Sequence, residues 1–200
     1  GGRDPYSNSK ACSELVTQSF KESFFDIKKI GIATVRSGNV IGGGDWAEDR
    51  LIPDIFRAFN AKKVLKVRNP KSIRPWQHVL EPLSGYLMLS ERLYNEHNTF
   101  SGAWNFGPNS DDEKTVKEIV KYISSNWKGS KWKVANNTSK LHEAELLKLD
   151  ISKASTLLGW RPKWTLKTTL DKIIHWQKSW INNKDIKEIC IREIKSYMKS

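Results

Sequence analysis

The hydrophobic residues near the start of the chain change their spacing, and the change separates a helix from a strand. Residues 30–35, IGIATV, form a short apolar, β-branched run between a Lys-Lys pair and a glycine-rich segment. Such a run is typical of a strand that a parallel sheet buries on both faces. Residues 5–25 are compatible with a helix, with Asp4 as its capping residue and Pro5 at its first position. Helix, buried strand and glycine-rich loop in this order predict an α/β fold.

Two amphipathic helices are predicted in the middle of the chain, over residues 49–63 and 80–97. Their apolar positions recur every three or four residues, as expected for helices with one buried face. We expect the following side chains to point inward: Ile52, Ile55, Phe56 and Phe59 in the first helix, and Leu83, Leu87, Leu89 and Leu93 in the second. Residues 64–79 between them predict a short strand, a turn at Asn69-Pro70 and a basic-aromatic loop.

The last third of the chain is predicted to be mainly helical. Residues 102–124 have the pattern of a strand, a loop and a helix, and residues 131–134 that of a short strand. Two helices follow, joined by GWRPKW at residues 159–164, and a last helix covers residues 184–199. We expect these apolar residues to pack inward: Leu170, Ile173, Ile174 and the stretch 176–181, then Ile186, Ile189, Ile194 and Tyr197.

The charge of the chain is concentrated in its second half. The formal net charge is +12, and residues 114–200 contribute 17 Lys and 2 Arg against 8 acidic residues. A basic chain invites a nucleic-acid interpretation. The excess, however, is Lys spread at helical intervals, without interleaved aromatic residues or a known nucleic-acid module. A solvated lysine-rich surface therefore explains it better, and we expect no nucleic-acid partner.

The remaining composition excludes several classes of protein. Cys12 and Cys190 form no metal-binding or redox pattern, which favours free thiols in a reducing cytoplasm. No apolar run is long enough to cross a membrane, so we expect no membrane partner. The acidic and histidine residues show no metal-ligand spacing, and no metal is expected. The chain begins with GGRDP and reaches a helix almost at once, so we expect it to be a piece of a longer protein.

Tyr6 and Lys10 are the first candidates for chemistry. They stand four residues apart at the start of the predicted helix, which places them on one face about 5–6 Å apart at Cβ. A phenol is a poor base at neutral pH, but a neighbouring ammonium favours its ionised form. The pair could therefore act as a tuned acid/base, although a bare YxxxK pattern is also common on solvated helix surfaces. Glycines 42–44 allow close approach to a ligand, and a flexible turn explains them equally well.

Several motifs occur in one order along nearly the whole chain. They are DPYSNSK at residues 4–10, VRSGNVIGGGDW at 35–46, RLIPD at 50–54, IRPWQHV at 73–79 and LGWRPKWTL at 158–166. This combination resembles the C-terminal part of the extended short-chain dehydrogenase/reductase superfamily. Within it, the runs around the glycine-rich segment, RPWQHV and LHEAELLKLD resemble the bacterial CDP-glucose 4,6-dehydratases.

The resemblance implies an α/β fold made of the C-terminal part of an NAD-binding Rossmann-type parallel sheet and a smaller α/β substrate-binding domain. Residues 1–45 would belong to the Rossmann domain, with some later segments returning to it, and residues 46–200 mainly to the nucleotide-sugar-binding domain and C-terminal helices. The implied reaction is NAD-dependent dehydration of CDP-D-glucose to CDP-4-keto-6-deoxy-D-glucose, a lyase step in O-antigen precursor synthesis. The glycine-rich NAD turn and the acid pair for dehydration of such enzymes have no counterpart here.

The resemblance also implies roles for particular residues. Tyr6 would be the base and Lys10 its partner at the nicotinamide ribose, and both would contact NAD together with Ser37 and Gly38. The substrate contacts would be Asn39, Arg50, Leu51, Pro53, Arg74, His142 and Glu143. Arg74 is the best candidate for the diphosphate because its planar fork matches paired phosphate oxygens; the alternative is a surface Arg stacked on Trp76. His78 is expected to be structural.

Two alternatives stay open at this point. Another nucleotide-sugar epimerase, decarboxylase or dehydratase of the same superfamily would share Tyr6 and Lys10. A protein of another class, a non-catalytic basic binding protein, would explain the charge but not the ordered motifs. Enzymes of this superfamily commonly form homodimers through the helix that carries YxxxK, so Leu15 and Ser19 are candidates for an interface.

Overall fold

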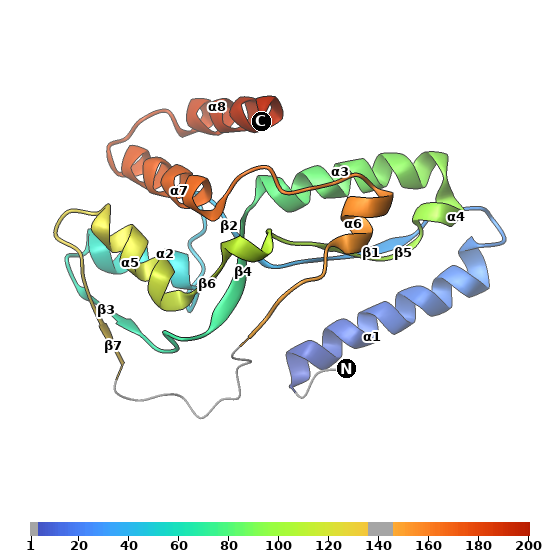
Figure 1. The fold of residues 1–200 in the computed structure, drawn as a ribbon, viewed down its shortest axis with the longest axis horizontal. Helices are drawn as coiled ribbons and strands as arrows, with labels where there is room; N and C mark the ends of the chain where they lie inside the picture. The colour runs from blue at the N-terminus through green and yellow to red at the C-terminus, as the bar shows by residue number, and fades with distance from the viewer. Residues whose placement is uncertain (1–3, 136–145) are drawn as a thin grey trace. The chain divides into compact units, whose positions relative to one another are not determined.

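A computed structural model describes residues 4–135 and 146–200 of the chain. The chain divides into two compact units, each assembled from three segments (Figure 1). Unit 1 comprises Gly1–Ser37, Leu83–Phe106 and Asp150–Arg161, and unit 2 comprises Gly38–Pro82, Gly107–Leu149 and Pro162–Ser200. Each unit contains parallel strands and helices, so the predicted α/β class is confirmed.

Unit 1 begins with the helix that the sequence predicts. α1 (Pro5–Phe20) continues into a π-helical turn, η1 (Lys21–Phe25). The carboxylate of Asp4 accepts a 3.0 Å hydrogen bond from the backbone N–H of Ser7, and Pro5 occupies the first helical position. The predicted capping is therefore confirmed, and it places the start of α1 at a defined residue.

The sheet of unit 1 has two strands, which pair in parallel: β1 (Ala33–Ser37) and β5 (Gly102–Phe106). The strand predicted at residues 30–35 is present but begins at Ala33, and the prediction that it is buried on both faces is wrong. Val35 is 41% exposed. Among the described residues β1 pairs with β5 alone, which leaves its other edge and its outward side chains accessible.

The core of unit 1 lies between this sheet and three helices: α3 (Leu80–Asn95), α4 (His97–Phe100) and α6 (Ser152–Leu157). Its buried residues are Leu89, Phe100, Trp104, Phe106, Ala154, Leu158 and Trp160. Leu89 confirms the prediction for α3, but Leu83 and Leu87 are exposed. Gly85 of α3 lies against the ring of Phe106, because a Cβ at this glycine would be 2.3 Å from the ring. This contact determines which face of α3 is buried. Leu83 and Leu87 are each two residues from Gly85 and so point away.

Unit 2 holds a three-stranded and a two-stranded sheet. β2 (Asn39–Ile41) pairs in parallel with β4 (Ile73–His78), which pairs antiparallel with β6 (Glu113–Thr115) after the 3₁₀ turn η2 (Ser110–Asp112). β3 (Val64–Val67) pairs in parallel with β7 (Lys131–Val134). The basic-aromatic loop predicted here is wrong, because residues 73–78 form the central strand. A central strand buries both faces, which accounts for the burial of these polar and aromatic side chains.

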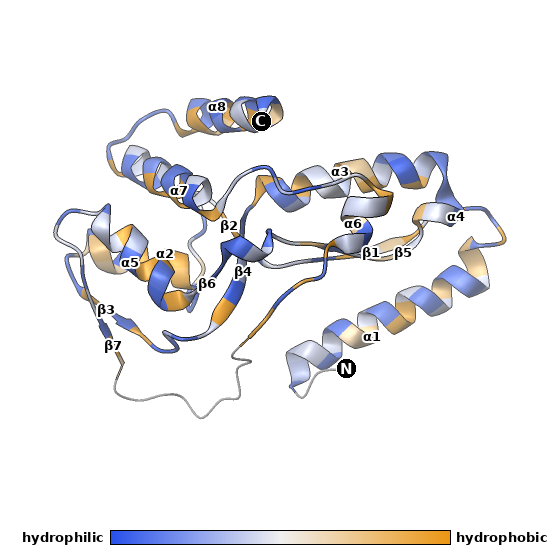
Figure 2. Ribbon diagram, in the orientation of Figure 1, coloured by the Kyte–Doolittle hydropathy of each residue, from blue (hydrophilic) through white to orange (hydrophobic). Residues whose placement is uncertain are grey.

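Four helices complete unit 2: α2 (Leu51–Asn60), α5 (Val116–Ser125), α7 (Leu166–Ile181) and α8 (Ile186–Lys199). Figure 2 shows hydrophobic positions gathered on α2 among hydrophilic ones. The predicted inward residues of α2 are all buried, as are Leu170, Ile173, Ile174 and Trp176 of α7. The prediction for α2 is confirmed, and Leu170, Ile173 and Ile174 share its hydrophobic core. The prediction that the whole stretch 176–181 packs inward is wrong, because Trp180 and Ile181 are 45% and 41% exposed.

The last helix differs from its prediction. Tyr197 is buried as expected, whereas Ile194 is 44% exposed and Glu193 is only 9% exposed. Glu193 and Tyr197 are one helical turn apart and share the inward face. The face is set by a hydrogen bond from the Tyr197 hydroxyl to a buried carboxylate, Glu81, rather than by apolar spacing. Among the described residues, no helix has the length and apolar character needed to cross a membrane.

Candidate functional site

The Tyr6–Lys10 pair lies in unit 1, at the N-terminal end of α1. Lys10 is one turn after Tyr6, and its Nζ is 5.5 Å from the centre of the Tyr6 ring. Tyr6 is 70% exposed, so its hydroxyl is accessible to a ligand. The structure thus places the two side chains together on one open helix face, as their spacing predicts.

Asp4 stabilises the helix turn that carries this pair. Its carboxylate accepts hydrogen bonds from the Ser7 hydroxyl at 2.6 Å and from the Ser7 backbone N–H at 3.0 Å. These bonds lower the pKa of Asp4, so it is a carboxylate at neutral pH. A negative charge at a helix N-terminus is also favoured by the helix dipole. The first turn of α1, and with it the position of Tyr6, is held by a local capping interaction.

A second candidate region is a cleft in unit 2, of about 230 Å³, between β2, β3, β4 and the start of α2. Four of the predicted substrate-binding residues line it: Asn39, Arg50, Leu51 and Arg74. They come from three different segments of the chain, and the fold brings them together. The cleft also has an aromatic wall, Trp76, whose indole N–H donates a 2.9 Å hydrogen bond to the Lys114 carbonyl.

Arg74 is the most buried charged residue of the cleft, with 7% exposure. It lies on the central strand β4, and its Nη1 donates a 2.9 Å hydrogen bond to the Ile73 carbonyl. The alternative of a surface arginine is wrong, because a central strand buries its side chains on both faces. A guanidinium that lines a cleft from such a position is held in place before any anion arrives.

The cleft contains charged residues that the sequence analysis missed. Arg68 forms a 3.0 Å ion pair with Asp49, and both line the cleft with Lys66 and Asp54. Asp54 is paired with Arg57. The signal in the sequence was the alternation of residues 64–68, which places Lys66 on the solvent face of β3 and leaves Arg68 exposed just after the strand.

Three predicted residues lie outside the cleft. Pro53 is buried in the first turn of α2 and does not line it. Ser37 ends β1 in unit 1. Gly38 precedes β2, and a Cβ there would lie 2.4 Å from the Pro75 carbonyl oxygen. The absence of a side chain at Gly38 is therefore explained by close packing on β4, whether or not a ligand is bound.

Two further predicted residues, His142 and Glu143, lie outside the described residues.

The glycine-rich segment has a packing role. A Cβ at Gly43 would lie 2.2 Å from the ring of Trp176, so the indole rests directly on the backbone. Gly44 has φ of +79°, a left-handed conformation that favours glycine. The next residues lead to Trp46, whose ring centre is 4.6 Å from that of Trp180. Within unit 2 these glycines allow an aromatic cluster to form, which accounts for them without a ligand.

His78 is structural, as predicted. It is 2% exposed, its Nδ1 accepts a 3.3 Å hydrogen bond from the Leu80 N–H, and its ring meets Trp164 edge-on at 4.9 Å. Burial, together with the nearby positive charge of Lys172, lowers the pKa of His78 to about 4. The imidazole is therefore neutral at physiological pH and caps the start of α3.

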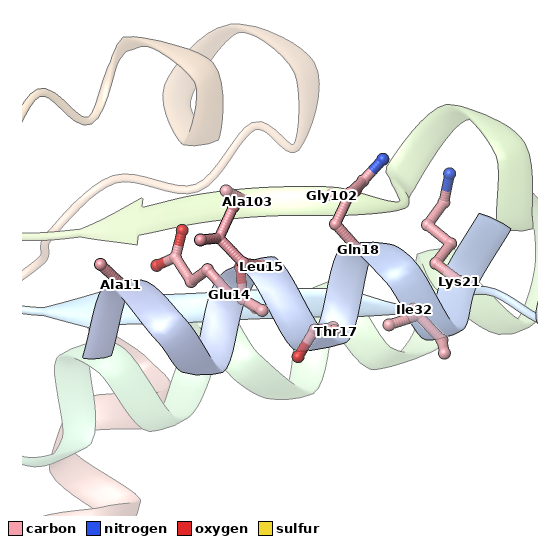
Figure 3. A pocket seen from close by; sticks show the side chains of 10 residues that line it. Ala11, Glu14, Leu15, Thr17, Gln18, Lys21, Ile32, Gly102 and Ala103 are labelled. Carbon is pink, nitrogen blue, oxygen red and sulfur yellow. The ribbon is translucent and has the colours of Figure 1, made fainter. Parts of the chain in front are cut away.

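A further cleft in unit 1, of about 380 Å³, lies between α1 and the strands β1 and β5 (Figure 3). Its two charged wall residues are already paired: Glu14 with Arg36, and Lys21 with Asp26. It contains neither Tyr6 nor Lys10. The cleft thus offers no unpaired charge to a phosphate and is not part of the candidate site.

The residues that the structure describes contain no group of three or more His, Cys, Asp or Glu placed to hold a metal ion.

Comparison with known proteins identifies the family. The sequence profile of the family described as GDP-mannose 4,6 dehydratase matches residues 1–173. The chain belongs to this family. The match covers the α1 pair, the cleft of unit 2 and the first half of α7, and it agrees with the resemblance found in the sequence.

One relative of this chain is a CDP-glucose 4,6-dehydratase of Salmonella typhimurium. It is 52% identical over 203 residues, which cover 99% of this chain and 56% of that protein. A dTDP-glucose 4,6-dehydratase of Escherichia coli is 24% identical over 185 residues, 90% of this chain and 49% of that protein. The chain thus spans about half the length of these relatives.

Solved structures show the same fold. A UDP-glucuronic acid 4-epimerase of Bacillus cereus, in complex with UDP-glucuronic acid and NAD, superposes with a TM-score of 0.73 at 20% identity, covering 88% of this chain and 53% of that one. A dTDP-glucose 4,6-dehydratase of Bacillus anthracis in complex with NAD gives a TM-score of 0.70 at 19% identity, covering 94% and 56%. At these identities the structural similarity establishes the fold of this chain.

Proposed function

We propose that the protein containing this chain dehydrates CDP-D-glucose to CDP-4-keto-6-deoxy-D-glucose with NAD as cofactor. The single observation that carries the proposal is the convergence of Asn39, Arg50, Leu51 and the buried Arg74 on one cleft of unit 2. The choice of cytidine among nucleotides follows the Salmonella relative, because identity of 52% over nearly the whole chain is far above that of the other named relatives.

The cleft suits a nucleoside diphosphate. Arg74 presents a planar fork from a rigid strand, which can donate two parallel hydrogen bonds to phosphate oxygens. Arg50 adds a second positive charge at the same cleft and forms no ion pair among the described residues. Asn39 offers an amide that can donate and accept. Phosphate recognition by Arg74 and Arg50 is therefore the chemistry we assign to this cleft, with Pro53, His142 and Glu143 as further proposed contacts of the substrate.

The Tyr6–Lys10 pair is the proposed acid/base. Tyr6 would take the proton of the sugar 4-hydroxyl as C4 is oxidised, and Lys10 would favour the phenolate from 5.5 Å away. The resulting 4-keto group acidifies C5–H, so that water can leave across C5–C6. We assign no described residue to that dehydration step.

The exposed end of α1 fits the cofactor that this chemistry requires. An open phenol hydroxyl and an ammonium on one face can both reach a ribose, and Ser37 and Gly38 are the further residues we propose at the nicotinamide end. When bound, NAD supplies the hydride acceptor and donor of the reaction. The chain's own part is to hold the cofactor and to move the proton at the Tyr6 oxygen.

We further propose that the protein is a cytoplasmic homodimer. The free thiols of Cys12 and Cys190 are compatible with a reducing compartment. Leu15, Val16 and Phe20 on α1 are 71%, 56% and 52% exposed. An apolar helix face of this kind, which also carries Ser19, is the proposed contact between two copies.

Titration of the whole protein that contains this chain with CDP tests the cleft directly. Arg74→Ala should weaken binding by about 1.5–3 kcal/mol, the cost of a charge-assisted contact, and Arg74→Lys should recover only part of the loss. Arg192→Ala removes an exposed arginine of the same unit and serves as the control. Equal affinity of wild type and Arg74→Ala for CDP would remove the diphosphate assignment.

Product analysis of the whole protein that contains this chain tests the reaction. Incubation with CDP-glucose and NAD should give a 4-keto-6-deoxy sugar, which is detected by its absorbance in alkali. A 4-epimer without this absorbance would identify an epimerase, and better turnover of UDP- or dTDP-glucose would correct the nucleotide. Absence of any turnover, with salt-dependent binding of DNA or RNA, would favour a non-catalytic basic protein.

A further inference from the structure

The two-stranded sheet of unit 2 has one strongly basic face. Along β3 the residues alternate, with Leu65 and Val67 buried and Lys66 exposed on the other face. Lys131 and Lys133 are exposed on the neighbouring strand β7. The alternation follows from the pleat of a strand, whose successive side chains point to opposite faces.

The register of this sheet places two lysines side by side. β3 and β7 pair in parallel with Lys66 opposite Lys133, whereas Lys131 is opposite Val64. Neighbouring strands are about 4.8 Å apart, so the Lys66 and Lys133 side chains leave the sheet next to one another. Like charges directly opposite each other destabilise a sheet. Neither lysine forms an ion pair within the part of the chain that the structure describes, so the repulsion is not offset there by an acidic neighbour.

One member of this pair also lines the substrate cleft. Lys66 stands in its wall with Arg50, and both lack an acidic partner among the described residues. The two acids that line the cleft among the described residues are already engaged, Asp49 by Arg68 and Asp54 by Arg57. The cleft therefore carries a positive excess, and Lys133 extends this excess outward along the sheet.

We propose that Lys66 and Lys133 form a cationic rim that draws the nucleoside diphosphate into the cleft and sets its rate of association. The inference rests on the proposed function of the cleft and deepens it. Lys133 sits beyond the cleft wall, so it acts on the approaching dianion through its field. Lys66 acts both on approach and in the bound state. A pair of like charges that costs stability in the free chain is relieved when a dianion binds beside it.

The two lysines are expected to differ in kinetic effect. A distant charge raises the association rate constant, is screened by salt, and leaves the dissociation rate nearly unchanged. Lys133→Gln should thus slow association about two- to fivefold at low ionic strength, and the effect should vanish near 0.5 M salt, where the screening length is only a few ångströms. Lys66→Gln should slow association similarly and also speed dissociation.

Stopped-flow binding of CDP to the whole protein that contains this chain, over a series of NaCl concentrations, measures these constants. Lys131→Gln is the matched control, because it removes the same charge from the same face of β7 about 6.6 Å further along the strand and opposite Val64. It should change association less than half as much as Lys133→Gln. The proposal of a cationic rim would be wrong if the two variants slowed association equally, or if salt did not reduce the effect of Lys133→Gln on association.

A second measurement does not depend on kinetics. Without CDP at low salt, Lys133→Gln should raise the midpoint of thermal unfolding, because it removes the like-charge neighbour of Lys66; saturating CDP should abolish or reverse this gain. An unchanged or lowered midpoint without CDP would also contradict the inference. If wild type binds CDP and Arg74→Ala does not, but Lys133→Gln behaves as wild type, the rim fails while the cleft assignment stands. If wild type does not bind CDP, both fail.

Discussion

The hydroxyl of Tyr197 donates a 2.7 Å hydrogen bond to Oε2 of Glu81, a carboxylate that is 1% exposed. The same carboxylate accepts backbone hydrogen bonds from Lys163 at 3.0 Å and Trp164 at 2.8 Å. One buried charge therefore joins the start of α3, the segment before α7 and the last helix of unit 2. These hydrogen bonds help to satisfy the carboxylate, which is the condition for burying it.

Removing the Tyr197 hydroxyl should loosen α8. In Tyr197→Phe the carboxylate loses one donor while the ring stays, so we expect unit 2 to lose about 1.5–3 kcal/mol, as for a hydrogen bond to a charged group. Urea unfolding measures the loss, and amide exchange should rise first in α8. Tyr122→Phe is the control, because its hydroxyl bonds the Asp171 carboxylate at 2.6 Å in a more exposed position. If Tyr122→Phe lost as much unfolding free energy as Tyr197→Phe, burial of Glu81 would not be the cause of the loss.

The stability of unit 2 should depend on the protonation of Glu193. Burial raises the pKa of Glu193 from its ordinary value of 4.5 to about 7, and the positive charge of Lys172 partly opposes the shift. Because the folded pKa is the higher one, this stabilising contribution is complete below pH 4.5 and is lost as the pH rises through 7. Glu193→Gln should remove this dependence.

The comparison of variants isolates Glu193, because buried His78 acts in the opposite sense. Its lowered pKa costs stability as the pH falls from about 6.5 through 4. The measured quantity is therefore the difference in unfolding free energy between wild type and Glu193→Gln from pH 4.5 to 8. A flat difference for Glu193→Gln would mean that this carboxyl titrates normally.

Substitution of Gly43 should destabilise unit 2 through Trp176. A Cβ 2.2 Å from the indole cannot be accommodated without movement, and overpacking of this kind costs about 1–3 kcal/mol. The double-mutant cycle with Trp176→Leu checks the cause by thermal unfolding. Gly43→Ala should cost much less once the indole is gone. If the losses of stability in the two variants were additive, glycine would be needed at position 43 for the conformation of the loop backbone and not for its contact with Trp176.

The proposed catalytic role of Tyr6 predicts a specific kinetic loss. In the whole protein that contains this chain, Tyr6→Phe should lower kcat by at least about 10²–10⁴-fold, the usual contribution of a general base, with CDP affinity unchanged. Tyr94→Phe, at a tyrosine that is 90% exposed on α3, is the control. Turnover of Tyr6→Phe within a few-fold of wild type would remove the assignment.

The exposed face of α1 predicts self-association. Leu15→Glu places a charge among Val16 and Phe20, and it should shift a dimer toward monomer in sedimentation velocity of the whole protein. Lys29→Glu introduces the same residue beyond the end of α1 and η1 and should leave the dimer intact. A dimer that persists in Leu15→Glu would direct the search to another face.

Local signals in the sequence predicted most elements but not all of their faces. Asp4, Pro5 and the periodicity of α2 each act through neighbours within a turn or two, and these predictions were confirmed. Leu87 and Ile194 were assigned inward on apolar character alone and are exposed. In both helices the buried face is chosen by a residue distant in sequence, Phe106 for α3 and Glu81 for α8.

The candidate site shows the same limit. The residues that line the cleft were named from motifs, and four of them converge, but spacing alone could not predict that Arg74 is buried on a central strand. A basic, proline-containing hexapeptide has the composition of a loop. It becomes a strand because β2 and β6 pair with its two edges, and these strands come from residues more than 30 positions away on either side.

The interleaving of the two units along the chain constrains the order in which they can form. Unit 1 receives its last segment, which supplies Trp160 to its core, only after two segments of unit 2 have been synthesised. Glu81 and its hydrogen-bond partner Tyr197 are 116 residues apart in the sequence. Contacts of such long sequence separation are entropically costly to close and slow to form. On the ribosome, unit 1 therefore stays incomplete until residues 150–161 have been made, and the carboxylate of Glu81 acquires Tyr197 as a partner only after 116 further residues have followed Glu81.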